Sequence, residues 1–551
     1  MANKVRGKWK ETCLRGDVAA LVFAIAKYPE HINCTLDEER NTPLSLCITA
    51  NHPTAVFKLL EGKADPNVCL KDGDTPLHLA ARANSEQMVG ELFRCRANPA
   101  ASNHSMELPL HTACKNNNMA IVKKLVASNT ETVNFHNRFG QTPLSIACEV
   151  SSLDMVNFLI DNGSHVDGCN SQRSDLWNWC NFPVLIAARA GDCELLELLI
   201  HKEASLTIKD NHGYTALHHS AEQGNFEVLS LLLRTSSLGI DSITIENHTV
   251  LYLSCKSRKY TVTHAVLTKM HESLPANTFS RLLDHAASDG GSCLLLSTEN
   301  GDKDIIKDLL IFGATISSSR SDGNSPLHVA CMNGYHHVAK SFLLAMEEPE
   351  RTELLNAPNA IGSTSLILAA EEAHIDVVRL LIDLKCNIDH QRLLDGATAL
   401  FMACLEGHIE VVQLLISFGA SYSLGSPQTG AFPLFIACQQ GFEEILKVLY
   451  STMNREQRYK ETNRLCLDCT SPLYIAAESG YSNIVQTLLT NNANPNHQVD
   501  TGSTAIFAAS QNGKIEVVRL LLEHKADPCI TRKDGISPLF AACTTNQVSG
   551  S

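Results

Sequence analysis

Apolar residues recur along the chain at helical spacing, in short segments separated by glycine and polar residues. In the segment "GHIEVVQLLISFGA" they form one broad stripe around a helix, made of Ile409, Val411, Val412, Leu414, Leu415 and Ile416. Gly419 follows and is expected to end this helix. The stripe is wide enough to be buried on more than one side, which predicts a helix packed between neighbours.

A second pattern precedes each of these helices, a short apolar segment that opens on T-P-L or a variant, as in "DTPLHLAA" and "NSPLHVAC". Thr or Ser caps a helix well, and proline is tolerated in the first turn, so we expect a helix to begin at the second residue of the pattern, here called the anchor. The anchors are Pro43, Pro76, Pro109, Pro143, Pro183, Ala216, Val250, Cys293, Pro326, Ser365, Ala399, Pro433, Pro472, Ala505 and Pro538. Successive anchors are 33 or 34 residues apart, except for spacings of 40, 43, 39 and 39.

A turn signal lies eight residues after most anchors. Glycine stands there at Gly191, Gly224, Gly334, Gly407, Gly441, Gly480 and Gly513. Three earlier repeats have Asn51, Asn84 and Asn117 instead. Both residue types tolerate the left-handed backbone that a tight turn between antiparallel helices needs. One helix pair cannot bury its own apolar surface, so neighbouring pairs must stack.

The period and the T-P-L-H-x-A pattern resemble the ankyrin repeat over nearly the whole chain. The resemblance implies an all-α solenoid of stacked helix-turn-helix units with β-turn fingers. An opening repeat around "CLRGDVAALVFAI" brings the count to sixteen, and the last repeat lacks its second helix. We expect an N-terminal array over 1–243 (repeats 1–7), a joint of degenerate repeats 8 and 9 over 244–320, and a C-terminal array over 321–551 (repeats 10–16).

Composition and charge narrow the function classes. A net charge of −14 argues against sequence-independent binding to nucleic acid and against binding to anionic lipid. No signal peptide or membrane-spanning segment is expected, because the apolar run at 18–26 is too short to cross a bilayer. With no export signal, the 20 cysteines indicate reduced thiols in the cytoplasm or nucleus. We expect a monomer whose partners are other proteins.

Cysteine and histidine recur in the same frame. Eight cysteines lie five residues after an anchor or its equivalent: Cys13, Cys114, Cys148, Cys255, Cys331, Cys404, Cys438 and Cys543. One cysteine per stacked repeat predicts a buried ladder of small apolar side chains rather than a metal or redox centre. In ankyrin repeats the histidine of T-P-L-H ties neighbouring turns together, which implies structural roles for His78, His111, His218 and His328.

Cys466 and Cys469 form a C-x-x-C in the turn before the first helix of repeat 14. A structural zinc site needs four ligands, and the chain has no second C-x-x-C or paired histidine at the usual spacing. No H-E-x-x-H, G-x-S-x-G or G-x-x-x-x-G-K-[ST] motif occurs. We therefore expect no metal, no cofactor and no enzymatic activity.

Aromatic residues cluster in the predicted fingers of repeats 5 to 7. They are Phe139, Trp177, Trp179, His212 and Tyr214. Exposed aromatic side chains on adjacent fingers would form a hot spot for protein binding. The alternative is that the seven extra residues before this finger fold back and the tryptophans only cover a neighbouring loop.

By resemblance, the chain is a non-catalytic scaffold or adaptor that binds partner proteins through the concave and finger surface. A second hypothesis makes it the recognition region of a larger protein, with a kinase, ubiquitin-ligase-recruiting or death-type domain beyond residue 551. An enzyme hidden in 244–320 is a third hypothesis. The in-frame segment "LLLSTENGDKDIIKDLLIFGA" favours diverged repeats there instead.

Overall fold

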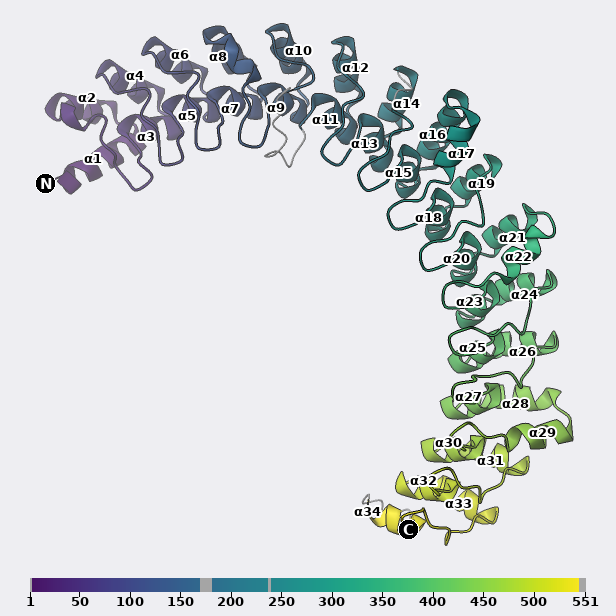
Figure 1. Cartoon of the computed structure of the whole chain (residues 1–551). Helices are drawn as coiled ribbons and strands as arrows, with labels where there is room; N and C mark the ends of the chain where they lie inside the picture. Colours follow the sequence, from purple (N-terminus) through teal and green to yellow (C-terminus); the bar gives the residue numbers. More distant parts are fainter. Residues whose placement is uncertain (1, 169–180, 236–238, 545–551) are drawn as a thin grey trace. The chain divides into compact units, whose positions relative to one another are not determined.

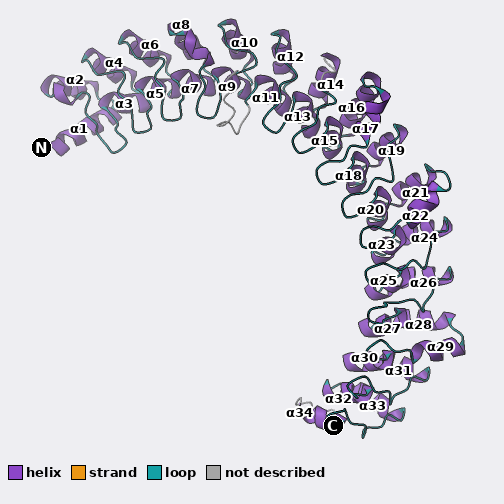
Figure 2. Cartoon of the chain, in the orientation of Figure 1, coloured by secondary structure: helices purple, strands orange, loops and turns teal. Residues whose placement is uncertain are grey.

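The structure is a computed structural model that describes residues 2–168, 181–235 and 239–544. Regular structure in these ranges is helical, and Figure 2 shows helices joined by loops, without a strand in the described residues. The chain divides into two compact bodies, Met1–Leu282 and Leu283–Ser551, called here the N-terminal and C-terminal bodies. Each body is a stack of helix pairs, so the predicted all-α repeat solenoid is confirmed.

The N-terminal body holds repeats 1 to 8, each with a first and a second helix. Its first helices are α1 (Ala2–Arg15), α3 (Pro43–Thr49), α5 (Pro76–Arg82), α7 (Pro109–Lys115), α9 (Pro143–Glu149), α11 (Pro183–Ala190), α13 (Ala216–Gln223) and α15 (Val250–Lys256). Its second helices are α2 (Val18–Lys27), α4 (Pro53–Glu61), α6 (Glu86–Arg94), α8 (Met119–Ser128), α10 (Leu153–Asp161), α12 (Cys193–His201), α14 (Phe226–Thr235) and α16 (Tyr260–Ser273).

The C-terminal body holds repeats 9 to 16. Its first helices are α18 (Cys293–Asn300), α20 (Pro326–Met332), α23 (Ser365–Glu371), α25 (Ala399–Glu406), α27 (Pro433–Gln440), α30 (Pro472–Ser479), α32 (Ala505–Gln511) and α34 (Pro538–Thr544). Its second helices are α19 (Lys303–Ile311), α21 (His336–Leu344), α24 (Ile375–Asp383), α26 (Ile409–Ser417), α28 (Glu443–Thr452), α31 (Ser482–Thr490) and α33 (Ile515–Glu523). Within each body, Figure 1 shows the first helices in one row and the second helices in another.

Every anchor is the first residue of a helix, including Val250 and Cys293 of the degenerate repeats. Local capping explains why. The hydroxyl of Thr142 accepts a hydrogen bond from the Ser145 amide at 3.2 Å, and the Ser145 hydroxyl accepts one from the Thr142 amide at 2.9 Å. This reciprocal pair satisfies two amides that the start of a helix leaves without partners.

The predicted turns also adopt the expected backbone. The φ angles of the seven glycines lie between 64° and 90°, and those of the three asparagines between 52° and 57°. Three of the four long spacings contain an additional helix: α17 (Ala276–Leu283), α22 (Glu350–Asn356) and α29 (Arg455–Thr462). Short 3-10 helices lie at η1 (Pro29–His31) and η2 (Thr130–Asn134). The fourth long spacing includes residues 169–180, outside the described ranges.

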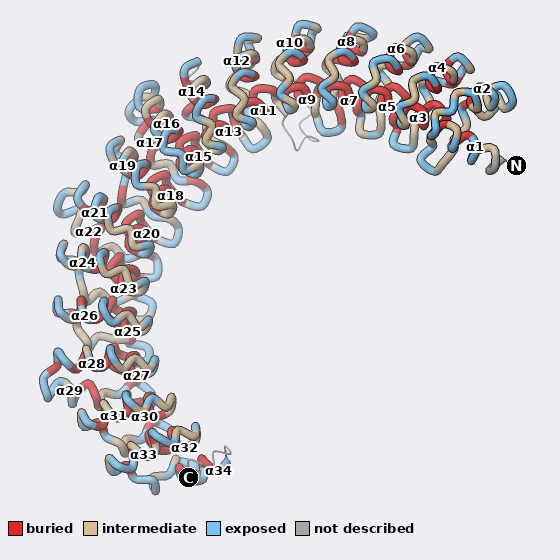
Figure 3. Tube along the Cα trace, turned by 180° about the vertical axis from the view of Figure 1, so that it is seen from behind, coloured by how far each residue is buried: buried red, intermediate tan, exposed pale blue. Residues whose placement is uncertain are grey.

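The core runs along the first helices, as the buried segments in Figure 3 show. In α5, each residue from Pro76 to Ala81 is buried. The second helices bury a narrower stripe than the sequence suggests. In α26, Val411, Val412, Leu414 and Leu415 are buried. Ile409 is exposed, because it stands in the first turn, outside the face that meets the first helices.

Candidate protein-binding surface

In the described ranges, the loops that precede the first helices from α3 onward, the one before α11 aside, form fingers that project from the first-helix row (Figure 1). The residue six before the anchor closes the finger, as when the Val499 amide donates to the Ser503 carbonyl at 2.9 Å. Adjacent fingers are joined by main-chain hydrogen bonds, for example from Leu467 to the Thr429 carbonyl at 2.9 Å. Equivalent bonds join Lys71 to Glu39, His104 to Asp72, Arg138 to Ser105, Ile245 to His212, Ala360 to Asp322 and Lys533 to Thr501.

The T-P-L-H histidines lie beneath the fingers and tie neighbouring repeats together, as the resemblance implies. His78 Nε2 lies 2.8 Å from the Glu107 carbonyl oxygen in the next finger. His328 Nε2 lies 3.0 Å from the carbonyl oxygen of Ala357. Burial lowers the pKa of His111 and of His218 to about 4, so these rings are neutral near pH 7.

The predicted aromatic site is described in part. Phe139 is 53% exposed and His212 is also exposed. Tyr214 is only 9% exposed, because its ring packs against His219 with centroids 5.1 Å apart. This differs from the expected exposed position: the side chain turns under the finger. Trp177 and Trp179 lie outside the described residues.

The cysteine ladder is buried as predicted at seven of its eight positions. Cys543 on α34 is exposed, since no described helix packs on the far side of α34. Cys466 is buried and Cys469 half-buried, in the turn before α30. Among the described residues, no three His, Cys, Asp or Glu side chains gather as a metal ion would require.

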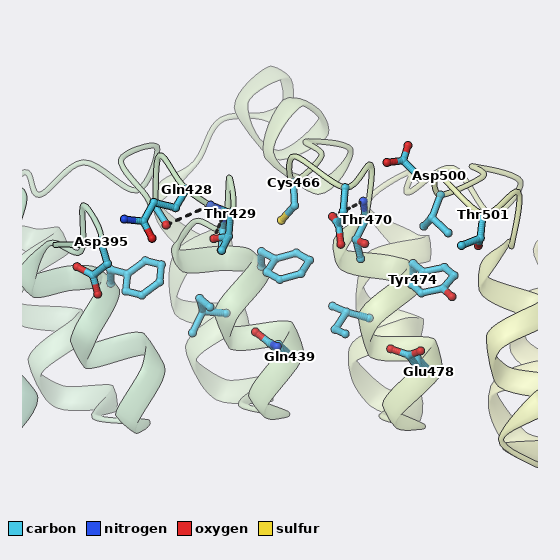
Figure 4. Close-up of a pocket in the computed structure, with 18 residues that line it drawn as sticks. Asp395, Gln428, Thr429, Gln439, Cys466, Thr470, Tyr474, Glu478, Asp500 and Thr501 are labelled. Atoms are coloured by element: carbon cyan, nitrogen blue, oxygen red, sulfur yellow. Dashed lines mark hydrogen bonds between the residues drawn. The ribbon is translucent and has the colours of Figure 1, made fainter.

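The structure adds a groove that we did not predict from the sequence. It has a volume of about 690 Å³ and lies between the fingers and first helices of repeats 12 to 15 in the C-terminal body. Figure 4 shows Thr429, Thr470 and Thr501 on the fingers, with Gln439 and Glu478 on the helices opposite. The rings of Phe401, Phe435 and Tyr474 line the groove from α25, α27 and α30.

The groove is negatively charged. Four of its described lining residues are acidic, Asp395, Asp468, Glu478 and Asp500, and none is Lys, Arg or His. Asp395 accepts a hydrogen bond from Arg392 at 2.9 Å, and this contact lowers the pKa of the carboxyl group. None of the ion pairs among the described residues involves the other three.

Two neutral groups, one in the groove and one beside it, have raised pKa values. Burial raises the pKa of the Tyr474 hydroxyl, and the carboxylate of Glu478 raises it further. The Cys469 thiol beside the groove has a raised pKa because it is hydrogen-bonded to Asp500. Both groups are therefore uncharged near pH 7, and the carboxylates set the charge of the groove.

A signal for the groove is present in the sequence. Two residues after the anchor, where four earlier repeats carry His78, His111, His218 and His328, repeats 12 to 16 carry Phe401, Phe435, Tyr474, Phe507 and Phe540. The first three of these consecutive aromatic residues line the groove. Its acidic members are scattered over three loops and one helix, so they become a cluster only after folding.

Stacked pairs of short helices with tied, projecting fingers define a helical-repeat fold of the kind that binds other proteins. The family model for ankyrin repeats (3 copies) matches residues 12–103, 88–171, 184–275, 294–392, 384–463 and 468–550. The chain belongs to the ankyrin-repeat family, whose repeats generally mediate protein–protein interaction and are non-catalytic.

Individual relatives match parts of the chain. The human transient receptor potential cation channel subfamily A member 1 is 25% identical over 45% of this chain and 24% of its own length. The NF-kappa-B inhibitor cactus of Drosophila melanogaster is 31% identical over 41% of each chain. The solved human ASB11 ankyrin repeat domain is 23% identical, with a TM-score of 0.35 over 41% of this chain and 97% of its own.

The matches cover between 17% and 50% of the length of these and other curated relatives. In the described ranges, each helix is too short or too polar to cross a bilayer.

Proposed function

We propose that this chain is a non-catalytic scaffold or adaptor that binds partner proteins, acting in the cytoplasm or nucleus. The observation that carries the proposal is the groove over α25, α27 and α30, where aromatic rings lie together with three carboxylates that have no ion-pair partner among the described residues, beside a row of tied fingers. Unpaired charges next to apolar side chains are typical of surfaces that a partner covers.

We propose a second contact on the fingers of repeats 5 to 7, carried by Phe139, Trp177, Trp179 and His212. The exposed ring of Phe139 supports it. Tyr214 supports the finger from below, because its ring packs on the histidines of α13.

The experiment compares partners captured by the full chain and by a variant carrying Trp177→Ala and Trp179→Ala. Loss of two hot-spot tryptophans should weaken binding by about 2 to 4 kcal/mol and leave the denaturant midpoint nearly unchanged. Phe418→Ala provides the control, since this ring is exposed beyond α26 in the second-helix row. A large fall in the midpoint of the tryptophan variant would instead mean that these rings are core.

The second candidate is the recognition region of a longer protein with a kinase, ubiquitin-ligase-recruiting or death-type effector domain. The observation that favours it is that the matches cover at most half of each curated relative's length. Sequencing the transcript past residue 551 decides between the two.

A further inference from the structure

A finger arginine of this chain already pairs with two carboxylates of repeat 9. Arg320, six residues before the anchor of repeat 10, lies 2.6 Å from the Glu299 carboxylate and 3.8 Å from the Asp289 carboxylate. Glu299 stands six residues after the anchor of repeat 9, and Asp289 four residues before it. One carboxylate on the preceding finger and one on the preceding first helix therefore hold the guanidinium group.

Repeat 14 carries the same two acids. Asp468 stands four residues before its anchor and Glu478 six residues after it. Among the fifteen anchored repeats, only repeats 9 and 14 have carboxylates at both positions. Both acids line the groove of Figure 4, and neither belongs to an ion pair among the described residues.

For repeat 14, the residue that corresponds to Arg320 is Val499, on the finger of repeat 15. The chain therefore has no arginine at this position. The two positions are equivalent in the structure: the Arg320 amide donates to Asn324 at 3.2 Å, and the Val499 amide donates to Ser503 at 2.9 Å. Valine is short and apolar, so it cannot neutralise the two acids. It leaves room in the groove for a cationic group.

An aromatic ring completes the arrangement. In repeat 16 the same finger position is Arg532, whose guanidinium carbon lies 5.6 Å from the centre of the Phe507 ring. Phe507 stands two residues after its anchor, as Tyr474 does in repeat 14. Repeat 14 therefore has carboxylates at the two positions that bind Arg320 in repeat 9, and a ring at the position that lies beside Arg532 in repeat 15. This combination suits a guanidinium group.

We propose that the groove binds an extended, positively charged segment of a partner protein, with one arginine between Asp468 and Glu478 over Tyr474. This inference rests on the proposed function and names the partner's chemistry. Asp500 extends the negative charge along the fingers, and Phe435 lines the groove on the neighbouring first helix. Three first helices at about 10 Å separation span about 20 Å, which matches roughly six extended residues and favours a polypeptide over a small free cation.

The test selects binders from a display library of random dodecapeptides on the immobilised full chain and on its Val499→Arg variant. The variant carries its own arginine at this finger position, as repeats 10 and 16 do. This arginine should occupy the groove and exclude the arginine of a peptide. Peptides that prefer the wild-type chain should contain arginine. Replacing that arginine by citrulline, which has the same shape without the charge, should weaken binding at least tenfold in fluorescence anisotropy.

Substitutions that remove a charge and keep the size of the side chain separate a loss of binding from a loss of folding. Asp468→Asn with Glu478→Gln should weaken the selected peptides at least tenfold. The matched control is Glu299→Gln, because the chain's own Arg320 already pairs with this carboxylate. It should leave peptide affinity unchanged.

The outcomes separate the two proposals. Peptides that bind wild-type chain and the Val499→Arg variant equally, or that lack arginine, overturn the inference, while partner capture through the fingers of repeats 5 to 7 would still support the proposed function. Absence of both selected peptides and finger-dependent partners would overturn both.

Discussion

At the scale of single residues, the position two after the anchor serves different purposes in different repeats. His78 uses both ring nitrogens within the protein, one towards the Thr75 amide and one towards the Glu107 carbonyl. Tyr474 stands at the same position of repeat 14, and its ring lines the groove. The same position can therefore hold an internal hydrogen-bonding residue or an aromatic residue that lines a groove.

The buried histidines predict a pH dependence of stability. In the folded chain the pKa of His111 and of His218 is about 4, against 6.5 without burial. The folded state therefore binds fewer protons than the unfolded state between these values. The contribution of these neutral histidines to the free energy of unfolding is fully present above pH 6.5 and is lost as the pH falls towards 4.

Urea unfolding at several pH values between 7.5 and 4.5 measures this effect. Because His111→Gln removes one titrating group, the slope of unfolding free energy against pH should fall by about 1 kcal/mol per pH unit. Equal slopes for the variant and the wild-type chain would show that His111 is not the source.

Of the aromatic site, the sequence identified the finger positions but not the direction of each side chain. Tyr214 and His212 stand two residues apart on one finger, yet only His212 is exposed. The turn sets that difference, since Tyr214 directly precedes the N-cap Thr215 and faces α13. The acidic groove was not predicted because its members come from different repeats.

At the scale of elements, helix starts and turns were predictable, because each depends on a local motif of a few residues. Capping by Thr or Ser and a left-handed residue at the turn act within one repeat. The inserted helices α17, α22 and α29 lack the T-P-L start, although Asn454 and Gln457 form a capping box at the start of α29. The last turn of α29 is fixed by a distant contact, a 2.6 Å hydrogen bond between the hydroxyls of Tyr450 and Thr462.

The turn between α25 and α26 gives a sharp test of this local control. Gly407 has a φ of 83°, and a Cβ atom there would lie 2.7 Å from the Phe442 ring. Gly407→Ala should therefore destabilise the chain by about 1 to 3 kcal/mol in urea unfolding. Gly90→Ala, inside α6 with only Lys124 Nζ at 3.8 Å, is the control and should be neutral or stabilising. Equal midpoints for the two variants would contradict the argument.

At the scale of the whole molecule, stability should vary along the chain because each repeat contacts only its neighbours. The division into two bodies after Leu282 falls within 244–320, where the repeat motifs are weakest and ten extra residues separate the anchors. We propose that this region is the least stable joint of the array.

Hydrogen exchange tests this proposal. Amides of 244–300 should exchange faster than those of repeats 11 to 15, because the weakest interface opens first. The matched comparison is between α15 and α25, two first helices of seven and eight residues. Equal protection of these helices would contradict a weak joint.

The hydrogen bonds between fingers have a consequence for how this surface can change. Each bond uses main-chain atoms, as between Leu467 and Thr429, so it is indifferent to which side chain the finger presents. Substitutions at exposed finger positions can therefore change which partner binds, with little effect on the stability of the fold. The fingers can be varied as a combinatorial library, while the anchors and turns that specify the fold are kept constant.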